Sequence, residues 1–224
     1  FDGTTVRNLV VRDFALLGGG DACVFASQSD GLVIEGLTVS NCQNGRGGIF
    51  VAAGAGVDNV TISGNEVSNV GPLGARGIVI WDGLKTDIRI TDNHVHDIAG
   101  CCGIELQDGR ASDVTITGNL IERTGDNGIG VVGLGGGSGV NLIANNVLTD
   151  TGRYGIELKL ANGTGRASGA GAVVIDGNTI SNANFATQHP GEQRDLAGIG
   201  VFRRGYVVGS GNVDIPHGVV VSNN

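Results

Sequence analysis

Two short sequence patterns recur at nearly constant spacing along the chain. In the first, a run of β-branched residues ends in an asparagine, and an aliphatic residue follows two positions later. These asparagines are Asn65, Asn93, Asn119, Asn145, Asn178 and Asn224, at steps of 28, 26, 26, 33 and 46 residues. In the second, a Gly-Ile pair opens an apolar run; its glycines are Gly48, Gly77, Gly103, Gly128, Gly155 and Gly198. A repeat of this length is typical of a solenoid, in which each repeat forms one coil that stacks on the next.

The pattern within each repeat predicts strands. Apolar and variable residues alternate with period two, and no segment has the helical periodicity that a βαβ crossover needs. The 42 glycines also disfavour helix. A β-sandwich would show hairpin signals and would not need identical residues at a fixed period. We therefore predict an all-β fold, a single right-handed parallel β-helix of about eight coils with a buried asparagine ladder. We expect residues 1–224 to be one domain and a segment of a longer solenoid.

Composition excludes some classes of partner. The formal net charge of −8 argues against a nucleic-acid-binding surface. No apolar run approaches the roughly 18 residues of a membrane span. Cys23 and Cys42 fall in apolar columns and are predicted to be small buried hydrophobes. Cys101 and Cys102 are adjacent, which disfavours a disulfide between them.

Alignment of the Gly-Ile strands predicts which side chains point outward, because neighbours on a strand alternate between its faces. The first outward column reads Val24, Phe50, Val79, Glu105, Gly130, Glu157 and Gly200. The second reads Ala26, Ala52, Trp81, Gln107, Val132, Lys159 and Phe202. The position before each glycine reads Asp21, Gly47, Arg76, Cys102, Asn127, Tyr154 and Ala197. Polar residues gather in the later coils, beside lengthening connections, and we expect a solvent-accessible groove there.

The Gly-Ile and Gly-Asn-x-Ile repeats resemble the right-handed β-helix repeat family, which includes pectate-lyase-like, alginate-lyase-like and mannuronan-epimerase-like enzymes. The segment Tyr154-Gly-Ile-Glu-Leu-Lys159 is similar to the epimerase signature Tyr-Gly-Phe/Ile-Asp-Pro-His. Glu157, Leu158 and Lys159 replace the Asp, Pro and His of that signature. The resemblance implies a polysaccharide partner, with a uronate polymer as substrate, and an extracellular or cell-surface location.

Elimination from a uronate polymer needs a base, an acid and a cation beside the sugar carboxylate. Lys159 is the candidate base and Tyr154 the candidate acid. The candidate substrate-binding residues on the same face are Trp81, Gln107, Arg153, Phe202 and Arg203.

Two further kinds of site use the carboxylates of this face. Glu105 and Glu157, two coils apart in one column, are expected about 9–10 Å apart and could form a hydrolase pair. Calcium is a candidate ligand of Glu105, Asp108 and Glu157.

His94 and His96 lie on one strand face, beside Asp97. Such a pair can chelate zinc, but no fourth ligand is evident, so we expect surface histidines and no metal site.

The sequence leaves open whether the chain is an enzyme. The alternative is a structural, adhesive or fibre-forming solenoid. Phe1 opens within a coil and Asn224 stops on the ladder. Exposed strand edges at such ends favour end-to-end association.

Overall fold

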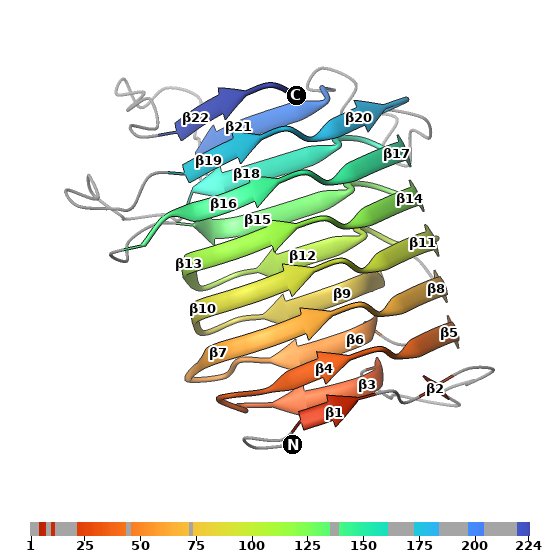
Figure 1. Cartoon of the computed structure of the whole chain (residues 1–224). Helices are drawn as coiled ribbons and strands as arrows, with labels where there is room; N and C mark the ends of the chain where they lie inside the picture. Colours follow the sequence, from red (N-terminus) through yellow and green to blue (C-terminus); the bar gives the residue numbers. More distant parts are fainter. Residues whose placement is uncertain are drawn as a thin grey trace, which may run out of the picture.

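The computed structural model describes residues 5–7, 10–11, 22–43, 46–71, 74–134, 139–160, 173–183, 197–203 and 219–224. All helix or strand structure assigned in these ranges is β-strand. Strands pair in parallel with their counterparts one coil earlier and one coil later, which builds a solenoid (Figure 1). This confirms the predicted fold class. The described residues form about five turns, so the predicted count of about eight coils is too high.

A coil contributes one strand to each of three rows. The first, here called the Gly-Ile row, contains β3 (Ala22–Ser27), β6 (Gly47–Ala52), β9 (Arg76–Trp81), β12 (Ile104–Gln107), β15 (Ile129–Leu134), β18 (Ile156–Leu160) and β21 (Ile199–Arg203). The second row contains β1 (Thr5–Arg7), β4 (Val33–Glu35), β7 (Gly56–Ser63), β10 (Leu84–Thr91), β13 (Arg110–Thr117), β16 (Asn141–Ala144), β19 (Val173–Asp176) and β22 (Val219–Ser222). The third row contains β2 (Val10–Val11), β5 (Thr38–Gln43), β8 (Glu66–Gly71), β11 (His94–Ile98), β14 (Leu120–Thr124), β17 (Val147–Thr151) and β20 (Thr179–Ser181).

The repeated glycine is explained by packing between rows. A Cβ atom on Gly103 would lie 2.5 Å from Cγ2 of Ile121, which enters the core from the third row. It would also lie 2.8 Å from the carbonyl oxygen of Gly128, one coil further on. A Cβ atom on Gly128 would likewise lie 2.5 Å from Cδ2 of Leu148. Glycine recurs here because the aliphatic side chain of the third row needs the space that a Cβ would occupy.

The asparagines form the predicted ladder. The backbone N–H and the Nδ2 of Asn93 both donate to Oδ1 of Asn119, at 3.0 and 2.9 Å. Nδ2 of Asn119 donates to the backbone carbonyl of Ile90 at 3.0 Å. These asparagines are almost completely buried. Each side chain thus satisfies its own polar groups and those of the preceding coil, which a buried amide requires.

One rung of the ladder differs from the prediction. Asn146, not Asn145, accepts from the backbone N–H and the Nδ2 of Asn119. The residue before each ladder asparagine has a positive φ, as in Asp92 (57°), Gly118 (69°) and Asn145 (55°). Glycine, asparagine and aspartate tolerate this conformation best. Asn145 therefore occupies the turn position, and the assignment of the ladder to it is wrong by one residue.

Both cysteine predictions are wrong. Cys23 in β3 and Cys42 in β5 form a disulfide with a Cα–Cα distance of 5.9 Å. These strands belong to the first and third rows of one coil, and the coil brings the two cysteines together across 19 residues. Cys101 and Cys102 also form a disulfide, in the connection before β12. None of the four cysteines is free.

Lys85 is a charged side chain that points into the solenoid. Lys85 in β10 is fully buried, and its ammonium donates to the backbone carbonyls of Asp82 (2.5 Å), Gly83 (3.2 Å) and Asp108 (2.6 Å). Burial lowers the pKa of Lys85 from 10.5 to about 8, against the opposing charges of Asp82 and Asp108. The lysine therefore links the turns of two successive coils by hydrogen bonds to their backbone.

Candidate functional site

The outward face of the Gly-Ile row brings together most of the predicted site residues. Glu105 pairs with Gly130, and Gly130 pairs with Glu157. Trp81 pairs with Gln107 one coil further on. This confirms the predicted register in these coils and places the two glutamates in one column. At a spacing of about 4.8 Å per coil, their backbones are about 9–10 Å apart.

In the first coil the register differs by one residue. Phe25, not Val24, pairs with Phe50. Val24 takes the inward position and is 6% exposed, whereas Phe25 is 41% exposed. In the second outward column, Ser27 takes the place of Ala26 and pairs with Ala52. Because neighbouring residues in this strand are all small or apolar, alternation alone cannot assign their faces.

The early coils of this face carry an aromatic stack. The rings of Phe25 and Phe50 lie 5.8 Å apart, and those of Phe50 and Trp81 lie 6.1 Å apart, both pairs stacked. The guanidinium groups of Arg46 and Arg76 lie over Trp81, at 5.9 and 4.8 Å from its ring. Trp81 is partly buried, so its indole is part of a packed cluster.

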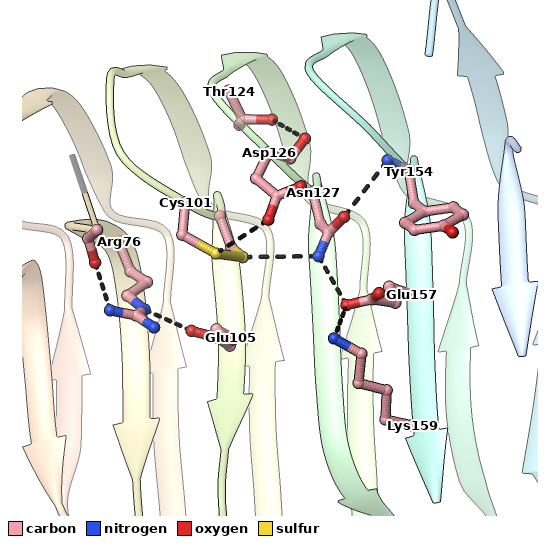
Figure 2. Close-up of a disulfide and its surroundings, with 11 residues drawn as sticks. Arg76, Cys101, Glu105, Thr124, Asp126, Asn127, Tyr154, Glu157 and Lys159 are labelled. Carbon is pink, nitrogen blue, oxygen red and sulfur yellow. Dashed lines mark hydrogen bonds and ion pairs between the residues drawn. A yellow bond between two sulfur atoms is a disulfide. The ribbon is translucent and has the colours of Figure 1, made fainter. Parts of the chain in front are cut away.

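The later coils carry buried charges (Figure 2). Nε of Arg76 donates to Oε2 of Glu105 at 2.5 Å. Glu157 receives two donors at Oε2: Nδ2 of Asn127 at 2.9 Å and Nζ of Lys159 at 2.8 Å. Arg76 and Asn127 belong to the column before the glycines. The sequence placed both on this face without indicating that they bind the two glutamates.

The two glutamates are not solvent-accessible, contrary to expectation. Glu105 is 6% exposed and Glu157 is 3% exposed. Burial raises the pKa of Glu105, and the Arg76 guanidinium opposes this shift. A buried carboxylate is costly unless it is paired and hydrogen-bonded, and both glutamates meet this condition. A buried carboxylate with a shifted pKa, such as that of Glu105, is a common feature of functional sites.

Tyr154 does not reach the solvent side of the row. It is 1% exposed, and the guanidinium of Arg153 lies 5.0 Å from the centre of its ring. Its backbone N–H donates to Oδ1 of Asn127 at 3.4 Å. Lys159 is the more accessible residue, with 35% of its side chain exposed. The predicted acid and base of an elimination reaction therefore lie in different environments, one inside the network and one at its surface.

Gln107, Phe202 and Arg203 complete the predicted set. Gln107 is partly buried, and its amide donates to Asp108 at 3.4 Å. Strand β21 places Phe202 beside Lys159 and Arg203 beside Leu160 in the register. The side chains of Phe202 and Arg203 lie outside what the structure describes, as do residues 161–172 and 184–196 of the long connections.

The expected calcium ligands do not converge. Within the described ranges, two groups of three His, Cys, Asp or Glu residues place one ligand atom each within 4.8 Å of one another. One is Cys101, Cys102 and Glu105, but both sulfurs are in the disulfide and Glu105 is bonded to Arg76. The other lies on the third row. Neither group contains Asp108 or Glu157.

The three rows of parallel strands and the asparagine ladder define an all-β parallel solenoid. The family model "Right handed beta helix region" matches residues 2–165, well over half of the chain, and the chain belongs to this family. Comparisons with curated proteins and with solved structures found no match. In the described part of the chain, no helix is long and apolar enough to cross a membrane.

Proposed function

We propose that the chain cleaves a uronate-containing polysaccharide along the outward face of the Gly-Ile row, with Glu105 and Glu157 as its acid–base pair. The observation that carries this proposal is the arrangement of two buried carboxylates in one column, two coils apart. Each is held by a cationic side chain. Membership of the β-helix family supports the fold alone, so the proposal depends on this geometry.

The backbone separation of the two glutamates is in the range that hydrolysis with inversion needs. In such enzymes the two carboxyl groups are about 6.5–9.5 Å apart, which leaves room for a water molecule and the sugar ring. Two coils give about 9–10 Å between backbones. Gly130 lies between the two glutamates, and a Cβ there would meet nothing closer than 3.6 Å. Gly130 is itself buried, and a Cβ there would touch Glu105, Cys102 and Asn127 at 3.6–3.8 Å, so the sugar ring has to displace neighbouring side chains to lie between the glutamates.

The environments of the two carboxyl groups suggest their roles. Burial raises the pKa of Glu105, which favours the protonated form that a general acid needs. Glu157 receives hydrogen bonds from Asn127 and Lys159 and serves as the base that activates water. These roles replace the assignment of acid to Tyr154, whose ring is buried under Arg153.

Lys159 supports an acidic polymer as the substrate. Its ammonium is the accessible member of an ion pair whose carboxylate partner has a side chain only 4% exposed. With a net charge of −8, the chain repels a polyanion at long range unless local cations offset the repulsion. Lys159, with 35% of its side chain exposed, supplies such a cation on this face.

The test is a panel of polyuronates and neutral glucans, assayed in parallel for new reducing ends and for ultraviolet absorbance of unsaturated uronate. Glu105→Gln and Glu157→Gln should each lower turnover at least about 100-fold. Glu35→Gln, on the second row, is the matched control and should leave turnover unchanged. Lys159→Ala should raise KM for polyuronates more than it lowers kcat.

The products decide between mechanisms. New reducing ends without unsaturated uronate would support hydrolysis. Unsaturated products would instead indicate an elimination in which Lys159 is the base. If the wild-type chain cleaves no polymer of the panel, the enzymatic proposal is wrong and a binding or structural role replaces it.

A further inference from the structure

Two histidines and two glutamates from three consecutive coils meet on the outward face of the third row. Glu66 begins β8, His94 and His96 belong to β11, and Glu122 belongs to β14. These strands are neighbours in the row (Figure 1). The register pairs Glu66 with His94 and His96 with Glu122. His94 and His96 are two residues apart on one strand, so they share a face.

The ligand atoms of this cluster are close together. Nε2 of His94 lies 2.9 Å from Oε2 of Glu122, and Nε2 of His96 lies 3.7 Å from Oε1 of Glu66. The two imidazole rings are 4.4 Å apart. Zinc bonds of about 2.0–2.1 Å in a tetrahedron put ligand atoms about 3.4 Å from one another. One ligand atom each of Glu66, His94 and His96 lies within 4.8 Å of the others, and Oε2 of Glu122 adjoins Nε2 of His94. Rotation of these surface side chains to other rotamers has to bring the four atoms to the zinc spacing.

A carboxylate already orients His96. Nδ1 of His96 lies 2.6 Å from Oδ2 of Asp97, which favours a proton on Nδ1; Nη2 of Arg123 lies further from the same nitrogen, at 3.3 Å. Arg123 holds Asp97 with two donors, Nε at 2.6 Å and Nη2 at 3.1 Å. A proton on Nδ1 leaves the lone pair of neutral His96 on Nε2, the nitrogen nearest Glu66. A histidine oriented in this way by a carboxylate is the usual arrangement of a metal ligand.

We propose that Glu66, His94, His96 and Glu122 bind a divalent transition metal ion such as Zn²⁺. Two imidazole nitrogens and two carboxylate oxygens suit zinc, whereas calcium and magnesium prefer all-oxygen sites with more ligands. Four protein ligands complete a tetrahedron, so the ion is structural and ties three coils together at the surface. Asp97 is a positioning residue that fixes the ring of His96.

The test is titration of the chelator-treated full chain with Zn²⁺ by calorimetry and with Co²⁺ by visible absorption. We expect one ion bound to this cluster, the absorption bands of tetrahedral cobalt, and a rise in Tm on addition of Zn²⁺. Ca²⁺ should produce none of these effects. His94→Gln and His96→Gln should abolish the cobalt bands. Glu66→Gln and Glu122→Gln remove ligands without touching the core and should each weaken Zn²⁺ binding. They are the test to use if a histidine variant fails to fold.

Asp97→Asn separates positioning from folding. Residue 97 has a φ of 55°, which asparagine tolerates, so the backbone should be unaffected. The variant should bind Zn²⁺ about 10–100-fold more weakly. The control is the double variant His189→Gln/His217→Gln, which removes the two other histidines of the chain and should bind as the wild type does.

The proposal is overturned if the wild type binds no Zn²⁺. It is also overturned if His94→Gln and His96→Gln bind as tightly as the wild type, or if the double variant loses the cobalt bands.

Discussion

Replacement of Asn119 by leucine tests the ladder at its centre. Leucine has similar length but neither donates nor accepts. The backbone N–H of Asn93 then loses its acceptor, the Oδ1 of Asn119 at 3.0 Å. The buried carbonyl of Ile90 loses the donor that lies 3.0 Å away. Oδ1 of Asn146 loses the Nδ2 donor at 2.9 Å but still accepts from the backbone N–H of residue 119 at 3.0 Å.

The size of the effect follows from these lost partners. A buried polar group left unsatisfied costs about 1–3 kcal/mol, so the Asn93 N–H and the Ile90 carbonyl together cost about 4 kcal/mol. For a domain of this length, Tm falls by about 2–4 °C per kcal/mol. We therefore expect Asn119→Leu to lower Tm by roughly 8–16 °C, measured by circular dichroism or calorimetry.

The control and the refuting result use the neighbouring rung. Asn145 holds a positive φ of 55° and is exposed, so Asn145→Gly should change stability by less than about 1 kcal/mol. Asn146→Leu should be as damaging as Asn119→Leu. A Tm within about 2 °C of the wild type for Asn119→Leu would refute the energetic role given to the ladder. Equal effects of the Asn145 and Asn146 substitutions would refute the register.

Two further predictions concern the interior. Since burial lowers the pKa of Lys85 to about 8 from 10.5, the unfolded chain binds more protons than the folded chain between these values. The free energy of unfolding of the wild type, relative to that of Lys85→Met, should therefore rise by about 3 kcal/mol across this pH window. Urea unfolding at several pH values measures this difference. A difference that is constant with pH would contradict the burial of the charge. Gly103→Ala should cost about 1–3 kcal/mol, because its Cβ would lie 2.5 Å from Ile121. Ile121→Ala removes Cγ2, so the double variant Gly103→Ala/Ile121→Ala should lose less stability than the sum of the two single variants. An unaltered Tm for Gly103→Ala would contradict the packing role of the glycine.

The buried pair Glu105 and Glu157 and the cluster around His94 occupy different rows, so their tests are independent. Loss of polymer cleavage in Glu105→Gln leaves zinc binding at His94 and His96 untouched. The solenoid thus presents two separate outward surfaces, one with buried paired charges and one with partly exposed potential ligands. Each can be altered without changing the inward columns that hold the coils together.

Errors in the register arose where the local pattern was degenerate. Two neighbouring asparagines, Asn145 and Asn146, each satisfy the repeat, and only the preceding positive-φ position separates them. The aliphatic residue two positions later does not separate them, because Val147 and Leu148 are both aliphatic. The structure shows the difference, with Leu148 buried and Val147 43% exposed. In β3, Val24 and Phe25 are both apolar, so the alternation of apolar and polar residues could not show which of them points outward.

Repetition allowed the sequence alone to determine the fold class, the parallel stacking and most of the columns. A residue in a solenoid meets its counterpart one period away, so spacing along the chain becomes position in space. That is why the column of Glu105, Gly130 and Glu157 could be predicted from alignment of the Gly-Ile strands.

Contacts between different rows and columns required the three-dimensional structure. The Cys23–Cys42 disulfide joins the first and third rows, and Arg76 reaches Glu105 from a neighbouring column. The approach of Glu66 and Glu122 to the two histidines likewise depends on side-chain directions that the repeat does not encode. The burial of the glutamates has the same origin. Period two indicates that a side chain points away from the core, but neighbouring side chains decide whether water reaches it.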